Sequence, residues 1–130
     1  MKVLVDTSVW SLVLRSRHDN YVHQLTELIK EGRVEIIGPI RQEILSGVRF
    51  QKQFDQLKTY LDAFPDIPLT TDEYVVAAQS FNKCRQKGIQ GSHIDFLICA
   101  VAQNHNLSIY TADKDFLLYA SVLPIQMYKM

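Results

Sequence analysis

Short apolar segments alternate with longer amphipathic segments along the chain. The apolar segments predict buried strands over 2–5, 34–37, 108–110 and 125–128. Apolar residues at helical spacing predict helices over 9–14, 19–31, about 39–48, 50–64, about 71–87, about 93–104 and 113–121. Residues 67–69 predict an extended link or a short edge strand. Strands that alternate with helices favour an α/β domain with a mostly parallel sheet and helices on both faces.

Composition narrows the class of protein. The chain has 130 residues, of which 47% are hydrophobic and 22% are charged, so we expect one soluble globular domain over 1–130. No apolar run is long enough to cross a bilayer, and Asp6 interrupts the apolar stretch at the N-terminus, so neither a membrane span nor a signal peptide is expected. We therefore expect a cytoplasmic protein in which Cys84 and Cys99 are free thiols.

The net charge is zero, with 14 basic and 14 acidic residues. A protein that attracts nucleic acid without sequence preference usually carries a basic excess. Any nucleic-acid site must therefore depend on a local patch, and Arg15, Arg17, Arg41 and Arg49 are candidates to contact phosphates. Solvated surface charge is the simpler interpretation of each of these arginines.

Two aspartates follow predicted strands. Asp6 comes directly after the first strand, and Asp113 comes three residues after Tyr110, which ends a later strand. Ligands of open parallel sheets bind outside the carboxyl ends of the strands, so both carboxylates are expected at the same rim. The simpler alternative is that each aspartate only caps the helix that follows it.

Two further acids border the apolar stripes of predicted helices. Asp95 lies at the edge of the stripe in 94–102, and Glu43 follows Ile40 by three residues. Carboxylates near a core are costly unless something pairs with them, and a divalent cation would provide the pairing. Oxygen ligands without histidine or cysteine favour Mg²⁺ or Mn²⁺ over zinc. Alternatively, Asp95 completes a capping box with Ser92, and Glu43 is a solvated helix residue.

Four segments resemble the PIN-domain family, and specifically the VapC-type toxins of toxin–antitoxin pairs. They are VLVDTSVW at 3–10, EILSG at 43–47, IDFLICAVA at 94–102 and IYTADKDF at 109–116. Their order and spacing agree with the family over essentially the whole chain. This sequence departs from the family pattern in having Phe96, rather than a small residue, after Asp95.

The resemblance implies a three-layer α/β/α fold and a Mg²⁺- or Mn²⁺-dependent endoribonuclease that cuts RNA. It also implies a homodimer that a cognate antitoxin inhibits. The family's four metal-binding and catalytic acids match Asp6, Glu43, Asp95 and Asp113. The resemblance further implies supporting roles for Ser8, Thr111 and Asp115.

The expected chemistry is hydrolysis of an RNA phosphodiester. Asp6 and Asp95 chiefly hold the metal, which activates a bound water, and Asp113 completes the coordination directly or through water. Glu43 orients the attacking water or acts as general base. One or two metal ions are both compatible with the sequence.

Other functions remain open at this point. An aspartyl-phosphate phosphotransferase would use Asp6 as nucleophile, although Ser8 stands where that chemistry usually places a second aspartate. A receiver-type domain would need an early pair of adjacent acids, which the chain lacks. A binding module without catalysis would keep its effect after Asp6→Asn or Asp95→Asn. Trp10 is expected to pack in the core and His93 to face outward, while the apolar face of 50–64 suits either the core or an interface.

Overall fold

A computed structural model describes residues 1–129 of the chain. The strands form a four-stranded sheet in the order β2-β1-β3-β4, and every pairing is parallel. The strands are β1 (Val3–Val5), β2 (Val34–Glu35), β3 (Ser108–Tyr110) and β4 (Gln126–Met127). The helices are α1 (Thr7–Leu14), α2 (Asp19–Lys30), α3 (Gly38–Leu45), α4 (Gln51–Leu61), α5 (Thr71–Gln86), α6 (His93–His105) and α7 (Asp115–Ala120). The expected α/β order and parallel sheet are confirmed.

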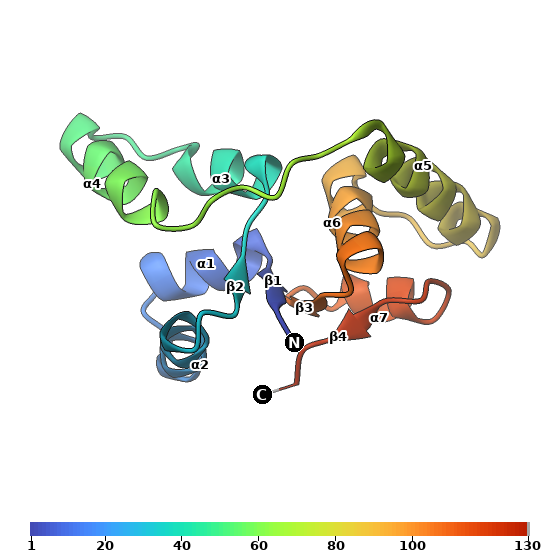
Figure 1. The fold of residues 1–130 in the computed structure, drawn as a ribbon, viewed down its shortest axis with the longest axis horizontal. Coiled ribbons are helices and arrows are strands. Elements are labelled where there is room, and N and C mark those ends of the chain that lie inside the picture. Colours follow the sequence, from blue (N-terminus) through green and yellow to red (C-terminus); the bar gives the residue numbers. More distant parts are fainter. Residues whose placement is uncertain (130) are drawn as a thin grey trace.

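Helices cover the sheet from two sides, which gives the expected α/β/α sandwich. In Figure 1, α1, α2 and α4 lie to the left of the strands, and α5, α6 and α7 lie to the right. Helix α5 packs along α6. Parallel strands need crossover connections, and the helices supply them while covering both faces of the sheet.

The two central strands form the middle of the core. Every residue of β1 and β3 is buried, which explains why β1 is uniformly apolar rather than alternating and why Ile109 and Tyr110 of β3 are both core residues. Trp10 on α1 is also fully buried, and its ring meets Phe64 edge to face at 5.6 Å between centroids. The expected packing role of Trp10 is therefore confirmed.

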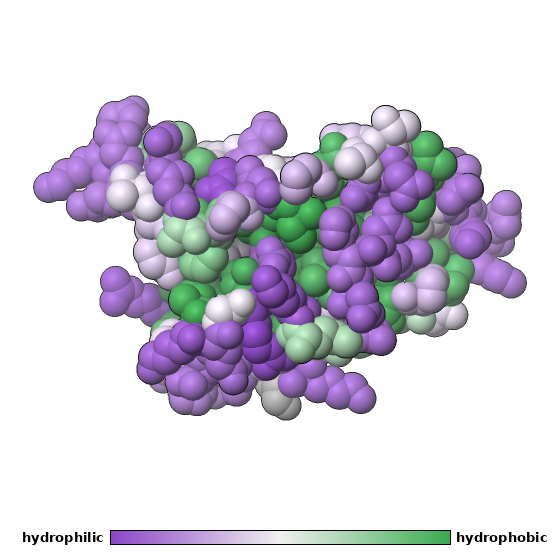
Figure 2. Space-filling view, in the orientation of Figure 1, coloured by the Kyte–Doolittle hydropathy of each residue, from purple (hydrophilic) through white to green (hydrophobic). Residues whose placement is uncertain are grey.

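Amphipathic helices form the outer layers. On the face shown in Figure 2, hydrophilic side chains gather over α2 and α4, and hydrophobic ones gather nearer the middle of the molecule. Helix α2 turns Leu25 and Leu28 into the core, and α4 buries Leu61. The apolar residues at helical spacing therefore form the face of each helix that packs on the core.

Several elements are shorter than the sequence pattern predicts. Strand β2 ends at Glu35 because Ile36 forms a bridge with Asp66 in the α4–α5 linker, where Ile67 N donates to Ile36 O at 2.9 Å. Helix α3 ends at Leu45, and Gly47 then adopts a left-handed backbone with φ of +84°. Apolar periodicity alone did not show either departure of the chain from regular structure.

Arg41 on α3 secures the linker that follows α4. Its Nε lies 3.0 Å from Asp66 Oδ1, and its Nη1 donates to the carbonyl of Leu61 at 3.0 Å. A further bond runs from Nη2 to the carbonyl of Phe64. These bonds use the guanidinium within the fold, so Arg41 is not a free phosphate contact.

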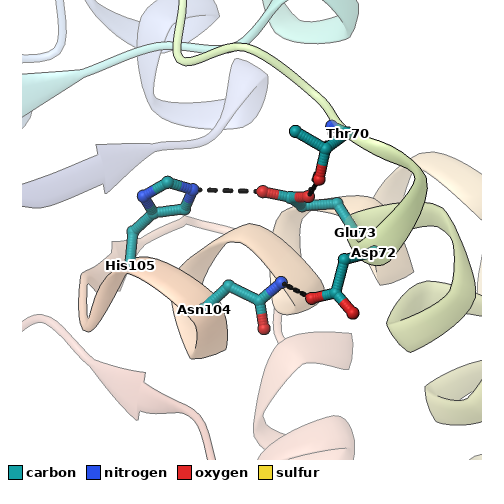
Figure 3. Close-up of polar contacts among 5 residues, drawn as sticks. All are labelled: Thr70, Asp72, Glu73, Asn104 and His105. Carbon is teal, nitrogen blue, oxygen red and sulfur yellow. Dashed lines mark hydrogen bonds and ion pairs between the residues drawn. The ribbon is translucent and has the colours of Figure 1, made fainter.

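A polar cluster joins the start of α5 to the end of α6 (Figure 3). Thr70 and Glu73 form a capping box, and the Thr70 hydroxyl donates to Glu73 Oε2. Oε1 of the same buried carboxylate lies 3.1 Å from His105 Nε2 on α6. Nearby, Asn104 Nδ2 donates to Asp72 Oδ2 at 2.8 Å. Two helix ends are thus held together through side chains that also satisfy the open backbone groups of α5.

Glu73→Gln is expected to make unfolding less sensitive to acid and to lower stability at neutral pH. The Thr70 hydroxyl, together with His105, lowers the pKa of Glu73 from 4.5 to about 2. A lowered carboxylate pKa stabilises the fold above the unfolded pKa, and this stabilisation is lost as pH falls from about 4.5 to about 2. Urea unfolding followed by the fluorescence of buried Trp10 measures both effects. Glu27→Gln, which removes an exposed carboxylate on α2, is the control. An unchanged pH slope in Glu73→Gln contradicts this account.

Both cysteines are free and buried, as expected. Burial raises the pKa of each thiol, which disfavours the reactive thiolate. Among residues 1–129, no helix is both long and apolar enough to span a bilayer.

Candidate functional site

Asp6 lies at the carboxyl end of β1, beside the end of β3. The parallel register pairs Val5 with Tyr110, and Asp6 N continues the ladder by donating to Tyr110 O at 2.9 Å. This register places the Asp6 carboxylate next to Thr111. Asp6 is only 7% exposed, so it is buried at this edge of the sheet. Asp6 also occupies the N-cap position of α1, but its side chain makes no capping hydrogen bond there.

Two hydroxyls hold the Asp6 carboxylate. Ser8 Oγ and Thr111 Oγ1 each donate to Asp6 Oδ2 at 2.8 Å. Backbone groups position the hydroxyls in turn, because Ala112 N donates to Ser8 Oγ at 2.9 Å and Asp113 N donates to Thr111 Oγ1 at 3.0 Å. Both hydroxyls bond to the same carboxylate oxygen, so within residues 1–129 Oδ1 accepts no such bond.

Asp113 lies in the turn between β3 and α7. Its Oδ1 accepts a hydrogen bond from Asp115 N at 2.9 Å, which forms a local turn just before α7. The N-cap residue of α7 is Lys114, so Asp113 is not itself the helix cap. Asp115 is exposed, and its backbone rather than its carboxylate contacts Asp113.

Asp95 lies in the first turn of α6. Ser92 is the N-cap of that helix, and its Oγ accepts from Asp95 N at 3.1 Å, as the sequence predicts. Burial chiefly raises the pKa of the Asp95 carboxyl, and the nearby charges of Asp6 and Asp113 raise it further. Acids from three separate parts of the chain therefore act on one another at this rim.

No pattern along the chain indicates the hydroxyl that holds Asp95. Tyr119 on α7 donates from its hydroxyl to Asp95 Oδ2 at 2.7 Å, although its ring is fully buried. Burial, together with the Asp95 carboxylate, raises the pKa of Tyr119, so the hydroxyl keeps its proton and remains a donor. In the sequence, Tyr119 is indistinguishable from an aromatic core residue.

Gly91 leaves room for the Tyr119 hydroxyl. A Cβ added at Gly91 would meet that hydroxyl and would lie 2.8 Å from Tyr119 Cζ and 3.0 Å from Phe96 Cε2. Real Cβ atoms do not approach other atoms at such distances, so a side chain at 91 would displace the tyrosine. A glycine just before α6 thus permits the contact between α7 and Asp95.

Glu43 is exposed on α3 and lies somewhat apart from the other acids. Thr7 Oγ1 donates to Glu43 Oε1 at 2.8 Å, and Thr7 directly follows Asp6 in the chain. Both residues line a shallow depression of about 410 Å³ that also includes Ser11 and Arg15. Glu43 therefore connects to the rim through Thr7, while Asp6, Asp95 and Asp113 form its electrostatically coupled part.

The acid set suits a hard divalent cation in charge and donor type. All its donors are carboxylate or hydroxyl oxygens, which Mg²⁺ and Mn²⁺ prefer. However, among residues 1–129 no three acidic, histidine or cysteine side chains stand close enough to hold a metal ion directly. Mg²⁺ usually retains several waters, so direct contact with three carboxylates is not required of such a site.

Three solved structures illustrate the similarity of the fold. VapBC2 from Rickettsia felis bound to a DNA fragment from their promoter matches with a TM-score of 0.83 and 17% identity, over 100% of this chain and 99% of that chain. FitAcB from Neisseria gonorrhoeae matches with a TM-score of 0.79 and 22% identity, over 98% and 96%. A toxin-antitoxin complex from Klebsiella pneumoniae matches with a TM-score of 0.69 and 21% identity, over 88% and 90%.

A search of curated proteins found no match. The family model of the PIN domain matches residues 3–121, which include every acid of the rim as well as Ser8, Thr111 and Tyr119. The resemblance seen in the sequence motifs is thus confirmed over most of the chain, and the protein belongs to the PIN domain family.

Proposed function

We propose that the protein is a Mg²⁺-dependent endoribonuclease formed by a single domain over 1–130, although Met130 lies outside the described residues. The catalytic and metal-binding residues are Asp6, Glu43, Asp95 and Asp113, and Mn²⁺ is a possible substitute for Mg²⁺. The observation that carries the proposal is the Asp6 carboxylate, held by Ser8 and Thr111 at the carboxyl edge of a parallel sheet, where the charges of Asp6 and Asp113 help to raise the pKa of Asp95.

Like charges at this rim favour binding of a divalent cation. The partly buried Asp95 carboxylate, which the charges of Asp6 and Asp113 destabilise, gains stability when a cation neutralises these charges. A bound Mg²⁺ supplies an activated water and polarises the phosphodiester. Because no three acids among residues 1–129 converge directly, Asp6, Asp95 and Asp113 would hold Mg²⁺ partly through waters that the ion retains.

Neighbouring side chains and backbone groups position the acids of the site. Ser8 and Thr111 fix the Asp6 carboxylate through Oδ2 and, within residues 1–129, leave Oδ1 without a hydroxyl donor. Tyr119 fixes Asp95 in the same manner, and Asp115 supports Asp113 through its backbone. Glu43 is exposed and bonded to Thr7, so its carboxylate is accessible to accept a proton from an attacking water.

We further propose that the protein is the toxin of a toxin–antitoxin pair, acts in the cytoplasm and is inhibited by its cognate antitoxin. The support is the similarity of the fold to a toxin-antitoxin complex and to VapBC2 over nearly the full chain. A homodimer is also expected. Exposed apolar side chains on α5 and α7, such as Val75, Leu117 and Leu118, are available for such contacts.

The test is cleavage of a structured RNA pool by the purified, antitoxin-free protein. Cutting is expected with Mg²⁺, none is expected with EDTA, and excess Mg²⁺ should restore it. An Asp95→Asn preparation made in parallel reports contaminating nuclease. Equal cutting by both preparations, or cutting that persists in EDTA, would overturn the proposal.

Growth and phosphoenzyme assays, run beside the cleavage assay, separate the alternatives. A binding module would inhibit growth without cutting RNA and would keep that effect in Asp95→Asn. A phosphotransferase with Asp6 as nucleophile would form an acid-stable, base-labile phosphoenzyme with a phosphoryl donor. Ser8 and Thr111 hold Asp6 as a hydrogen-bond acceptor, and Ser8 occupies the place of the second aspartate, which disfavours this alternative.

A further inference from the structure

A groove lies between α1, the α3–α4 loop and α4, beside the acid rim. Its volume is about 720 Å³. Three arginines line it. Arg15 directly follows α1, Arg17 lies in the α1–α2 loop and Arg49 lies in the α3–α4 loop. Leu14, Ile44 and Leu57 supply apolar lining between them. Among residues 1–129, no acidic residue lines this groove.

The arginines of the groove have no carboxylate partner within residues 1–129. Arg15 Nη2 donates only to the carbonyl of Ser46, at 3.3 Å, and the Arg49 guanidinium lies 6.0 Å from the centroid of the Phe50 ring. Arg41, by contrast, pairs with Asp66 and is used within the fold. Three uncompensated positive charges around one groove favour an anionic occupant.

Two aromatic rings at the groove are exposed to solvent. Phe50 is 63% exposed and Tyr60 is 47% exposed. Large apolar rings left in water at a charged groove are typical of surfaces that bind flat, apolar groups. Nucleobases have such faces, and stacking on aromatic residues is a common way of holding single strands.

The groove leads toward the acid rim. Ser11 and Arg15 line both the groove and the depression that contains Thr7 and Glu43. A polyanion that lies in the groove can therefore continue past Glu43 toward Asp6. The chemistry proposed at Asp6 acts on a phosphodiester, so the occupant that suits both places is a nucleic-acid strand.

We propose that this groove binds a single-stranded segment of the RNA substrate, with Arg15, Arg17 and Arg49 contacting phosphates and Phe50 and Tyr60 stacking on bases. The inference rests on the proposed nuclease function and gives the neutral chain its local basic patch. Of the four arginines that the sequence suggested as phosphate contacts, the proposal assigns three to the RNA. The fourth, Arg41, is bonded within the fold.

The phosphate contacts are tested by binding of a fluorescein-labelled, single-stranded oligoribonucleotide in EDTA, where cleavage is prevented. Arg15→Gln combined with Arg49→Gln is expected to reduce the slope of log affinity against log salt by about 1.4, since each phosphate contact contributes about 0.7 for single strands. Arg85→Gln is the matched control, because Arg85 also lies over an aromatic ring, Phe81, but outside the groove. An unchanged slope in the double variant would overturn the phosphate assignment.

The stacking contacts are tested with Phe50→Leu and Tyr60→Leu in the same assay. Each is expected to weaken binding at least about fivefold. Tyr74→Leu removes a comparably exposed ring on α5 and should bind normally. Thermal unfolding followed by Trp10 fluorescence verifies that all variants are folded.

The result separates this inference from the proposed function. If the wild type cuts RNA with Mg²⁺ but groove variants bind and cut normally, the groove assignment is wrong and the nuclease stands. If the wild type never cuts RNA, the nuclease proposal fails. If groove variants keep RNA affinity and instead lose binding of the purified antitoxin, the groove is a protein interface and the inference is overturned.

Discussion

Asp6→Asn is expected to reduce RNA cleavage by at least about 100-fold without loss of the fold. Replacement of residues that merely support metal ligands costs about 10- to 100-fold, so loss of a proposed ligand should cost more. The asparagine oxygen can still accept hydrogen bonds from Ser8 and Thr111, and the removal of one negative charge lessens the repulsion on Asp95. The melting temperature in EDTA should therefore remain within about 5 °C of the wild type.

The matched control is Asp19→Asn, which removes an exposed carboxylate at the start of α2. It should cut RNA at the wild-type rate. Initial rates of RNA cleavage at saturating Mg²⁺ measure the effect. Titration with Mn²⁺ should show weaker metal binding in Asp6→Asn than in the wild type, and unchanged binding in Asp19→Asn. Wild-type rates in Asp6→Asn would remove this residue from the proposed site.

Tyr119→Phe is expected to weaken Mn²⁺ binding or cleavage by about 10- to 100-fold, the range seen when a residue that orients a metal ligand is replaced. Phenylalanine preserves the buried ring but removes the hydroxyl that donates to Asp95 at 2.7 Å. Because that bond lowers the pKa of Asp95, its loss raises the pKa further. Activity, which needs the ionised carboxylate, should then fall off at a higher pH on the acid side.

Tyr128→Phe provides the control for this change. Its hydroxyl donates to Gln24 Oε1 on α2 at 3.1 Å rather than to an acid of the rim, so its removal should leave the pH profile unchanged. Gly91→Ala should act like Tyr119→Phe, because the added Cβ would push the tyrosine away from Asp95. Equal metal affinity and an equal pH profile in the wild type and Tyr119→Phe would show that Tyr119 only packs.

The rim of acids was accessible from the sequence because it depends on short-range rules. Asp6 directly follows a uniformly apolar segment, and such segments become central parallel strands. The carboxyl ends of parallel strands lie at one edge, so Asp6 and the turn after Tyr110 had to meet. Ser92 likewise capped α6 as its position indicated, because an N-cap contacts backbone only a few residues ahead.

Local sequence patterns did not predict where each helix or strand ends, or which partners the individual arginines contact. Ile36 left its predicted strand to pair with Asp66, a contact between segments 30 residues apart. Arg41 and Arg49 look alike in the sequence, yet one is bonded inside the fold and the other lines an open groove. No local pattern distinguishes them, because their partners are brought near only by packing.

The sequence by itself determined the order of strands and helices, the parallel sheet and the edge at which its acids gather, since hydrophobic periodicity and strand direction fix these features locally. Only the tertiary structure decided that Tyr119 holds Asp95, that Gly91 makes room for it and that Phe50 stays exposed beside the arginines of the groove. These are contacts across the packed layers, and their distances depend on how whole helices pack together rather than on any neighbouring residue.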